Sequence, residues 1–527
     1  MSRTETGAYT DVDKKEDVKI LHSMGYAQEL DRRMSRFSNF AISFSIICIM
    51  SGGINSLAQA TSGAGGAGVG LGWPLGCAIS GVFALALAQI GSAYPTAGGL
   101  YHWGSILGNR FTGWLTAWLN LLGLVTVLGA INVGTWTFFA GAFGDALHLN
   151  SDTSTNLGMA NQIVFVAAIT AIQAIINHRG IKLTAMLTDW SGYLIFAAAV
   201  ALTLVALIFA EHWDFSRLWT FTNYSGLPAG DSPVWPKVPT SWVFLLGLLL
   251  PIYTITGYDA SAHTSEETQK ASHSVPRGIV HSVWWSAVFG WVMLGAFVLM
   301  IPNMDDAAKQ GWNVFFWALD ARVPLIIKEV LYIAIFFSQF LCGLATVTSA
   351  SRMIFAFSRD GGLPGSRALA KVSPLYRTPV AAIWTASILA VLFVGGASLV
   401  TIGGSSAYTI VVSCTVIFLF LSFSVPIFLA LFAHGTPKWD RMGPWDLGAN
   451  WFKIVCVLSL ISMVLIFFIG IQPPNDWALY ITVGFLVLTA IVWFAFENWR
   501  FKGPPIGDMI AKRQAQIAAA EKAVGEI

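Results

Sequence analysis

Long apolar runs that lack charged residues recur along the whole chain. Each run has 18 or more residues, enough to cross roughly 30 Å of hydrocarbon as an α-helix. Only 11% of the 527 residues are charged, whereas about a quarter are charged in soluble globular domains. We therefore predict an all-α polytopic membrane protein with twelve transmembrane helices, at about 37–60, 71–94, 112–144, 160–177, 184–210, 241–262, 278–301, 324–356, 379–400, 404–432, 452–471 and 476–496.

Lysine and arginine are divided unequally between the connections. Of the 30 Lys and Arg residues, 23 lie in the two termini or after even-numbered helices, only four lie after odd-numbered helices, and three (Lys328, Arg352 and Lys453) lie inside predicted spans. Positive residues accumulate on the cytoplasmic side of membranes. The first 36 residues are polar, so we expect no cleaved signal peptide. We predict a multi-pass protein of the plasma (inner) membrane with both termini in the cytoplasm.

Other function classes find little support in the motifs. All five cysteines lie within or at the edge of apolar runs, without the spacing of metal ligands or disulfides. Neither a catalytic Ser/His/Asp array nor an HExxH motif occurs among the spans. We predict no enzymatic activity, no cofactor, no metal site and no nucleic-acid partner.

The order of the helices suggests an internal repeat. Helices 3 and 8 are both unusually long, and helices 1 and 6, which also stand five apart, are both interrupted by Gly or Pro. Because five is odd, a repeat of five helices must insert in the opposite sense to its partner. The alternative is that Gly and Pro merely kink continuous helices. The predicted divisions are a cytoplasmic segment 1–36, a first repeat 37–210, an extracellular loop 211–240, a second repeat 241–432, two added helices 433–496 and a cytoplasmic tail 497–527.

Helix 1 contains "SIICIMSGGINSLAQA", residues 45–60, with poor helix formers at its middle. A break in hydrocarbon leaves backbone groups unpaired at several kcal/mol each, unless they line a cavity or bind something. If the outer half-helix begins just after Ser51, then the amides of Gly52, Gly53 and Ile54 are free at its positive end. Such an end suits a carboxylate, and glycine lets a substrate approach the backbone.

Helix 6 contains "LLLPIYTITGYDASAH", in which Pro251 and Gly257 flank a polar patch with Thr254 and Thr256. The outer half of this helix should end near Tyr253, leaving unpaired carbonyls at a negative dipole end. That end suits an ammonium group. Together the two interruptions predict a main-chain receptor for a small zwitterion.

Four stretches resemble the amino acid, polyamine and organocation permease superfamily. They are "IMSGGI", "AYPTAGGLYHW", "TGYDASAHTSEETQKASHSVPRGI" and "SASRMIFAFSRDGGLP". Within the superfamily the chain is most similar to the branch of 4-aminobutyrate (GABA), choline and bidirectional amino acid permeases. The resemblance implies the five-plus-five inverted repeat shared with the bacterial leucine transporter, followed by two further helices.

The resemblance also implies substrate-binding positions in both interruptions. These are Ser51, Gly52 and Gly53 in helix 1 and Ile255, Thr256 and Gly257 in helix 6. Tyr253 stands where related permeases have an aromatic gate. The family's usual Gly-Ser-Gly or Gly-Thr-Gly reads Ser-Gly-Gly here, which displaces a hydroxyl contact by one residue.

The coupling ion stays open between proton and sodium. Some proton-coupled relatives have a Lys in helix 5 where Ile195 stands here. Sodium-coupled relatives use hydroxyls on helix 8, where this chain has Thr346, Thr348 and Ser349, although such hydroxyls also bond their own backbone. Asp259 in helix 6 is either a proton or cation carrier or a cap for the inner half-helix. Exchange without any ion is a further alternative.

Charges after helices 6 and 8 form a candidate inner gate. Glu266 and Glu267 should lie near Arg352 and Arg359 on the cytoplasmic side. The alternative is a set of exposed surface pairs, each worth only about 0–1 kcal/mol.

These patterns predict a secondary active transporter that moves a small amino acid such as GABA, or a related amine, by alternating access. The expected partners are that substrate, the lipid bilayer and a coupling ion. The alternatives are a transporter of choline or polyamines, an amino acid exchanger without ion coupling, and a nutrient sensor that does not transport.

Overall fold

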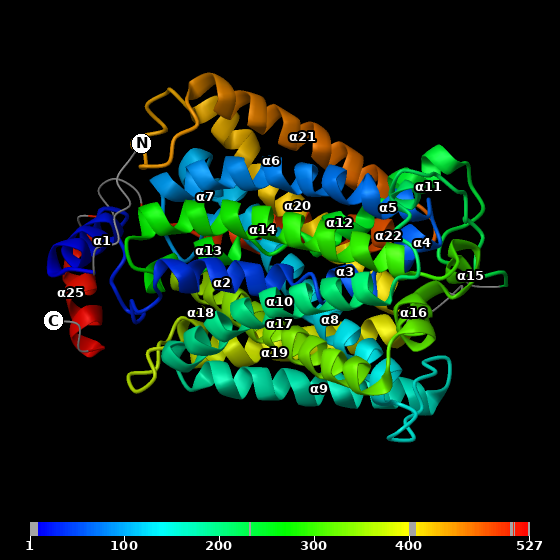
Figure 1. Ribbon diagram of the computed structural model, residues 1–527. Helices are drawn as coiled ribbons and strands as arrows, with labels where there is room; N and C mark the ends of the chain where they lie inside the picture. The colour runs from blue at the N-terminus through cyan, green and yellow to red at the C-terminus, as the bar shows by residue number, and fades with distance from the viewer. Residues whose placement is uncertain (1–8, 231–232, 400–406, 506–509, 511, 525–527) are drawn as a thin grey trace.

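The fold is a bundle of helices that run side by side (Figure 1). The computed structural model describes residues 9–230, 233–399, 407–505, 510 and 512–524. Within these residues the only β-pairing is a single bridge between Met34 and Thr268. The all-α class predicted from the sequence is confirmed.

Eleven helices in the described part of the chain are long and apolar enough to cross a membrane. They are built on α2 (Arg36–Ile47), α6 (Gly72–Ala93), α8 (Arg110–Phe143), α9 (Asn156–His178), α10 (Ile181–Phe209), α14 (Ala271–Met300), α17 (Leu325–Arg359), α19 (Val380–Leu399), α20 (Ala407–Ala433), α21 (Ala449–Gly470) and α22 (Trp477–Val492). The first of them continues past an interruption into α3 (Gly52–Asn55).

The predicted span 241–262 is the one that is missing from this set, because it is broken into three pieces. These are α11 (Thr240–Gly247), α12 (Leu249–Thr254) and α13 (Ala260–His263). The count of twelve therefore stays a prediction. The inverted repeat and the predicted domain divisions also stay predictions, although α8 and α17 are alike in length, at 34 and 35 residues.

Helix α14 begins at Ala271, seven residues before the predicted start at 278. Its first turns, "ASHSVPR", are too polar to be recognised from hydropathy. The backbone amides of Lys270 and Ala271 donate to the Asp17 carboxylate, at 2.8 and 3.2 Å. A side chain from the distant N-terminal segment therefore supplies the acceptors that the start of this helix needs.

The bundle has two different ends (Figure 1). One end, here called the terminal end, carries α1 (Asp11–Ser23) and α25 (Gln514–Ala523). The other, the distal end, carries short helices in the connections: α4 (Ala58–Thr61), α5 (Gly66–Gly70), α15 (Met304–Lys309) and α16 (Val314–Arg322). The remaining short helices are α7 (Leu100–Leu107), α18 (Ser366–Leu369) and α23 (Asn498–Arg500), with a π-helical turn at Trp493–Glu497.

Burial separates the inner helices from the outer ones. The most apolar window of Arg36–Asn55 is 89% buried and that of α8 is 83% buried, whereas that of α22 is only 17% buried. Because α22 is apolar on its exposed surface as well, we place it at the lipid-facing periphery. The interrupted first helix lies in the interior, where a site can be enclosed by protein.

Candidate functional site

The first helix loses its regular hydrogen bonding between Cys48 and Gly52. Helix α2 ends at Ile47, and α3 starts at Gly52. In the described structure the backbone amides of Ile49, Met50, Gly53 and Ile54 donate no hydrogen bond, a set of free donors in a buried segment. The amide of Gly52 donates to the Cys48 carbonyl at 3.2 Å, so the prediction that this amide is free is wrong.

The second interruption lies between α12 and α13. Helix α12 ends at Thr254, and Gly257 has a φ of +83°, a left-handed conformation that L side chains rarely adopt. A Cβ at Gly257 would lie 2.2 Å from Cγ2 of Ile46, so the chain here also packs too closely for any side chain. Of the described amides in this segment, those of Thr256, Gly257, Tyr258 and Asp259 donate no hydrogen bond.

The two interruptions meet at one small cavity. It has a volume of ≈ 10 Å³ and is lined by Ile46, Ile47, Ser51, Gly52, Val127, Ile131, Tyr253, Thr254 and Thr256. This is about the space of one water molecule, too little for an amino acid. The protein is therefore closed around this cavity, which must widen before it can hold a substrate.

The two glycines of helix 1 face protein. A Cβ at Gly52 would lie 2.6 Å from the hydroxyl oxygen of Thr254 and 2.8 Å from its Cα. A Cβ at Gly53 would only touch Leu294 and Trp73, at 3.5 and 3.7 Å. In this state Gly52 lets helices 1 and 6 pack against each other, and the close approach of a substrate to this glycine stays a prediction.

Gln339 on α17 is a residue that the sequence analysis missed. Its side-chain amide donates to the Met50 carbonyl at 3.0 Å and accepts from the Asn55 amide at 3.4 Å. It therefore joins the interruption in helix 1 to the short helix α3 that follows it. The available signal was a single amide in the apolar stretch "FFSQFLCG".

The hydroxyls expected at an ion site have different partners. Thr346 donates to its own backbone at Cys342, at 2.9 Å, which is the alternative to sodium binding considered above. Thr348 donates to the Asn177 side chain at 2.7 Å. The hydroxyl of Ser349 is buried without a hydrogen-bond partner. Ile195 is fully buried and carries no titratable group.

Asp259 occupies the N-cap position of α13, but its carboxylate does not cap that helix. The capping prediction is therefore wrong. One carboxylate oxygen, Oδ2, accepts from the Asn120 amide at 3.1 Å and lies 3.3 Å from Nε2 of His263. The other, Oδ1, is buried without a partner.

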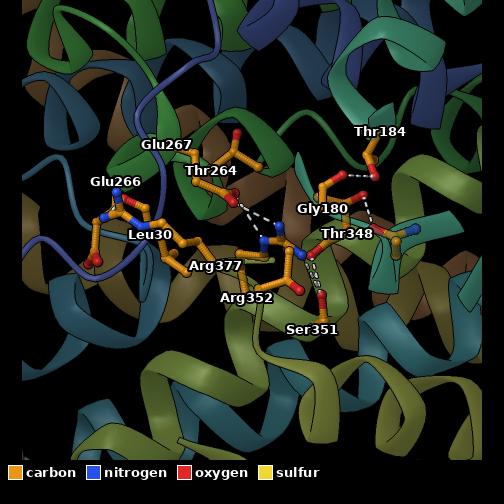
Figure 2. Close-up of polar contacts among 12 residues, drawn as sticks. Leu30, Gly180, Thr184, Thr264, Glu266, Glu267, Thr348, Ser351, Arg352 and Arg377 are labelled. Carbon is orange, nitrogen blue, oxygen red and sulfur yellow. Dashed lines mark hydrogen bonds and ion pairs between the residues drawn. The ribbon is translucent and has the colours of Figure 1, made fainter. Parts of the chain in front are cut away.

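The candidate gate residues form two buried ion pairs at the terminal end. Arg352 donates to both oxygens of Glu267, at 2.9 and 2.7 Å (Figure 2). Arg359 donates to both oxygens of Glu266, at 3.0 and 2.8 Å. Both glutamate side chains are 0% exposed, and the arginines are 1% and 10% exposed. The alternative of exposed surface pairs is therefore wrong.

Surrounding groups give the two glutamates different acidities. Burial raises the pKa of Glu266, but the Arg359 guanidinium and the amide of Ala97 outweigh it and hold this pKa below its ordinary value. For Glu267 burial outweighs Arg352, and its pKa is raised. The guanidinium of Arg359 also stacks 4.0 Å above the Tyr26 ring.

Both terminal segments cover these ion pairs. The side-chain amide of Gln28 donates to the Glu266 carbonyl at 2.9 Å, and Arg32 donates to the Ser265 carbonyl at 3.1 Å. Helix α25 contacts this N-terminal segment through Glu521, which accepts from the Gln28 backbone amide at 2.9 Å. Figure 2 shows Arg377 beside Leu30 of the same segment, and it donates to the Leu30 carbonyl at 3.3 Å. The terminal end is closed.

The distal end is hollow. A cavity of ≈ 320 Å³ lies there, lined by Ile54, Asn55, Trp136, Thr137, Ala140, Gly141, Ser151, Thr153, Gln162, Trp312, Asn313, Phe315 and Phe316. On α3, Gly52 lines the small central cavity and Ile54, two residues later, lines this one. On α8, Ile131 lines the central cavity and Trp136, five residues later, lines this one. The large cavity and the small central one therefore follow each other along the same two helices.

Comparison with known proteins identifies the family. A model of the family described as amino acid permease matches residues 34–496. The chain belongs to the amino acid permease family. The predicted superfamily resemblance is confirmed, and the protein is a transporter of amino acids and not an enzyme.

Several permeases of plants and fungi are similar to this one over most of their length. Amino-acid permease BAT1 of Arabidopsis thaliana is 29% identical, covering 92% of this chain and 95% of its own. Its homologue in Oryza sativa is 30% identical, covering 92% and 94%. Amino-acid permease 2 of Neurospora crassa is 27% identical, covering 92% and 88%. Both interruptions and both gate pairs lie inside residues 34–496, which the family model matches.

Proposed function

We propose that this permease moves a small zwitterionic amino acid, such as GABA, by alternating access. The observation that carries the proposal is the meeting of two non-helical segments at one small cavity, with the free amides of Gly53 and Ile54 directly after the cavity-lining residues Ser51 and Gly52 in the chain. Unpaired backbone groups in a membrane interior are costly, so they are retained where they line a cavity or meet a ligand.

In the proposed complex, the amides of Gly53 and Ile54 donate to the substrate carboxylate. Their positive half-helix end favours an anion, and the free amides at this point have no competing acceptor. The ammonium group lies near the carbonyls around Ile255 and Thr256. Tyr253 lines the same cavity and closes over the substrate from helix 6. Ser51 and Thr254 supply polar walls.

We propose that the structure represents a state closed at the terminal end, which faces the cytoplasm at the plasma membrane. The buried ion pairs and terminal segments support closure there, and the ≈ 320 Å³ cavity supports an approach route from the distal end. The excess of Lys and Arg in the termini and even-numbered connections supports this orientation. Labelling single cysteines placed in the distal loops of intact cells tests it, since the orientation requires reaction with an impermeant reagent.

Counterflow in liposomes tests the substrate class. The purified permease is reconstituted with unlabelled amino acid inside, and uptake of labelled GABA, alanine or choline is followed. We expect accumulation of a substrate that carries both a carboxylate and an ammonium group, because each group has its own half of the site. Accumulation of choline alone would contradict the proposal, since choline has no carboxylate for Gly53 and Ile54.

A variant of helix 6 completes this test. Gly257→Ala places a side chain in a left-handed conformation and against Ile46, so the interruption cannot keep its shape. We expect counterflow to be lost. Gly395→Ala is the matched control, because a Cβ there meets nothing within 4 Å and its helix lies far from the interruption in sequence.

A further inference from the structure

A carboxylate and an imidazole lie in contact in the interior, just below the interruption in helix 6. Asp259 and His263 are both 0% exposed, and Oδ2 of Asp259 lies 3.3 Å from Nε2 of His263. Asn120 of α8 donates to the same oxygen at 3.1 Å. The second oxygen, Oδ1, is buried and has no partner. The proposed function gives no role to this pair.

Counting hydrogens shows that the contact requires one exchangeable proton. Nδ1 of His263 lies 3.2 Å from the carbonyl oxygen of Ala97. A carbonyl oxygen can only accept, so Nδ1 carries the hydrogen, and a neutral ring then has a bare lone pair on Nε2. Facing an ionised Asp259, that lone pair would meet a negative oxygen. A hydrogen bond forms only when one more proton sits on Nε2 or on Oδ2.

Among the described residues, the charged groups on neighbouring elements have other partners or are at least partly exposed. On α17, Arg352 and Arg359 are bonded to Glu267 and Glu266. On α7, His102 is bonded to Tyr26 and Thr96. On α14, His273 and His281 are exposed and Arg277 is half-buried, and on α2 Arg36 is exposed. The elements otherwise present the uncharged side chains of Ser43, Asn120, Tyr258 and Ser422 to this region.

One residue joins this pair to the gate. The carbonyl of Ala97 accepts from His263, while the amide of Ala97 donates to Oε1 of Glu266 at 3.1 Å. Glu266 in turn holds Arg359. A change in the hydrogen bond to His263 therefore acts on the same backbone residue that positions a gate carboxylate.

We propose that Asp259 and His263 together bind the proton that is transported with the amino acid. The proton enters from the distal side, occupies the position between Oδ2 and Nε2, and leaves toward the terminal side when the gate opens, while Nδ1 keeps its own hydrogen. Without this proton the pair repels and the link through Ala97 loosens. This inference rests on the proposed function, since it needs an amino acid to be carried.

The test uses the full-length permease in liposomes that contain a pH-sensitive dye. Uptake of labelled amino acid and acidification of the lumen are recorded together, at about pH 5.5 and about pH 7.5 outside, because histidine is the side chain used for proton-dependent switching between about pH 5 and 8. For the wild type we expect acidification during uptake, and uptake that falls with rising pH by up to about tenfold per unit, the limit for one titrating proton.

Two variants separate this role from a structural one. Asp259→Asn keeps a hydrogen bond to Nε2 without an exchangeable proton, and His263→Gln keeps a donor toward Ala97. We expect both to lose acidification and pH dependence while counterflow, which needs no net proton movement, continues. His273→Gln, which removes an exposed histidine from α14, should behave like the wild type.

The outcomes distinguish the two proposals. Net uptake of amino acid by the wild type without acidification of the lumen overturns the proton site and leaves the proposed function intact. The site is also overturned if Asp259→Asn moves as many protons into the lumen per amino acid taken up as the wild type does. If no amino acid exchanges at all, then the proposed function itself fails. Should Asp259→Asn not fold, the wild-type measurement and His263→Gln still decide.

Discussion

The two ends of the bundle hold their charges in opposite ways. At the terminal end, Glu266 and Glu267 are fully buried and each accepts two hydrogen bonds from an arginine. At the distal end, the pairs Arg322 with Glu211, Lys328 with Asp320 and Lys309 with Asp306 have acidic partners that are 64%, 56% and 52% exposed. Water and salt screen the distal pairs and cannot reach the terminal ones.

This difference indicates where closure is stabilised. Removing one partner of a buried pair leaves an uncompensated charge and costs about 3–5 kcal/mol, against about 0–1 kcal/mol for an exposed pair. Buried ion pairs therefore stabilise closure of the terminal end. The exposed ion pairs of the distal end, where the cavity lies, contribute little to stability.

The largest effect is expected for Arg359→Ala. It leaves Glu266 buried without its cation, so the free energy of unfolding should fall by about 3–5 kcal/mol, measured by denaturant titration in detergent. The double variant Arg359→Ala with Glu266→Ala should recover part of this loss, since no buried charge then remains. Equal loss in the single and double variants would show that the pair does not act as a unit.

A smaller effect is expected where helices 1 and 6 touch. Gly52→Ala forces a methyl group against Thr254 and should cost about 1–3 kcal/mol of stability, with loss of counterflow. Gly53→Ala meets only Leu294 and Trp73 at ordinary contact distance and keeps its backbone amide, so it should change little. If the two variants behave alike, then the close approach of helix 6 to Gly52 is not what makes glycine necessary.

Acid should weaken the terminal end through Glu266. Its pKa is lower in the folded protein than its ordinary value of 4.5, so its contribution is present above that value and is lost as the pH falls through the folded pKa. Glu267, whose folded pKa is raised, acts in the opposite direction. Thermal unfolding of Glu266→Gln should be less sensitive to acid than that of the wild type. Unchanged acid sensitivity would show that Glu266 does not titrate in this range.

The smallest effect is expected at the distal end. Lys309→Ala removes the partner of Asp306, and both side chains are more than half exposed, at 59% and 52%. The change in unfolding free energy should be below about 1 kcal/mol and should vanish in high salt. A loss comparable to that of Arg359→Ala would remove the contrast between the two ends.

Local sequence was enough to locate features that depend on neighbouring residues. Ser51, Gly52 and Gly53 in one apolar run, and Pro251 and Gly257 in another, are poor helix formers wherever they occur, so the interruptions could be predicted. The helix positions followed from charge-poor runs for the same reason. The start of α14 could not, because its cap comes from Asp17, about 250 residues earlier.

The features that could not be predicted from the sequence depend on contacts between segments far apart in the chain. The gate pairs are buried because both termini cover them, and Gly52 faces Thr254 because helix 6 crosses it there. Gln339 and Asn120 stand alone in apolar helices, and only the packing shows that they bond to Met50 and Asp259. Which backbone amides of the interruption donate hydrogen bonds, such as that of Gly52, likewise depends on how the segment folds.

The central claim is that free amides of helix 1 hold a substrate carboxylate. A structure of the reconstituted permease with GABA bound, or with the amino acid that counterflow selects, tests it most directly. We predict carboxylate oxygens about 2.7–3.2 Å from the amide nitrogens of Gly53 and Ile54, in a widened central cavity. A carboxylate bound elsewhere, with both amides still unpaired, would contradict the account.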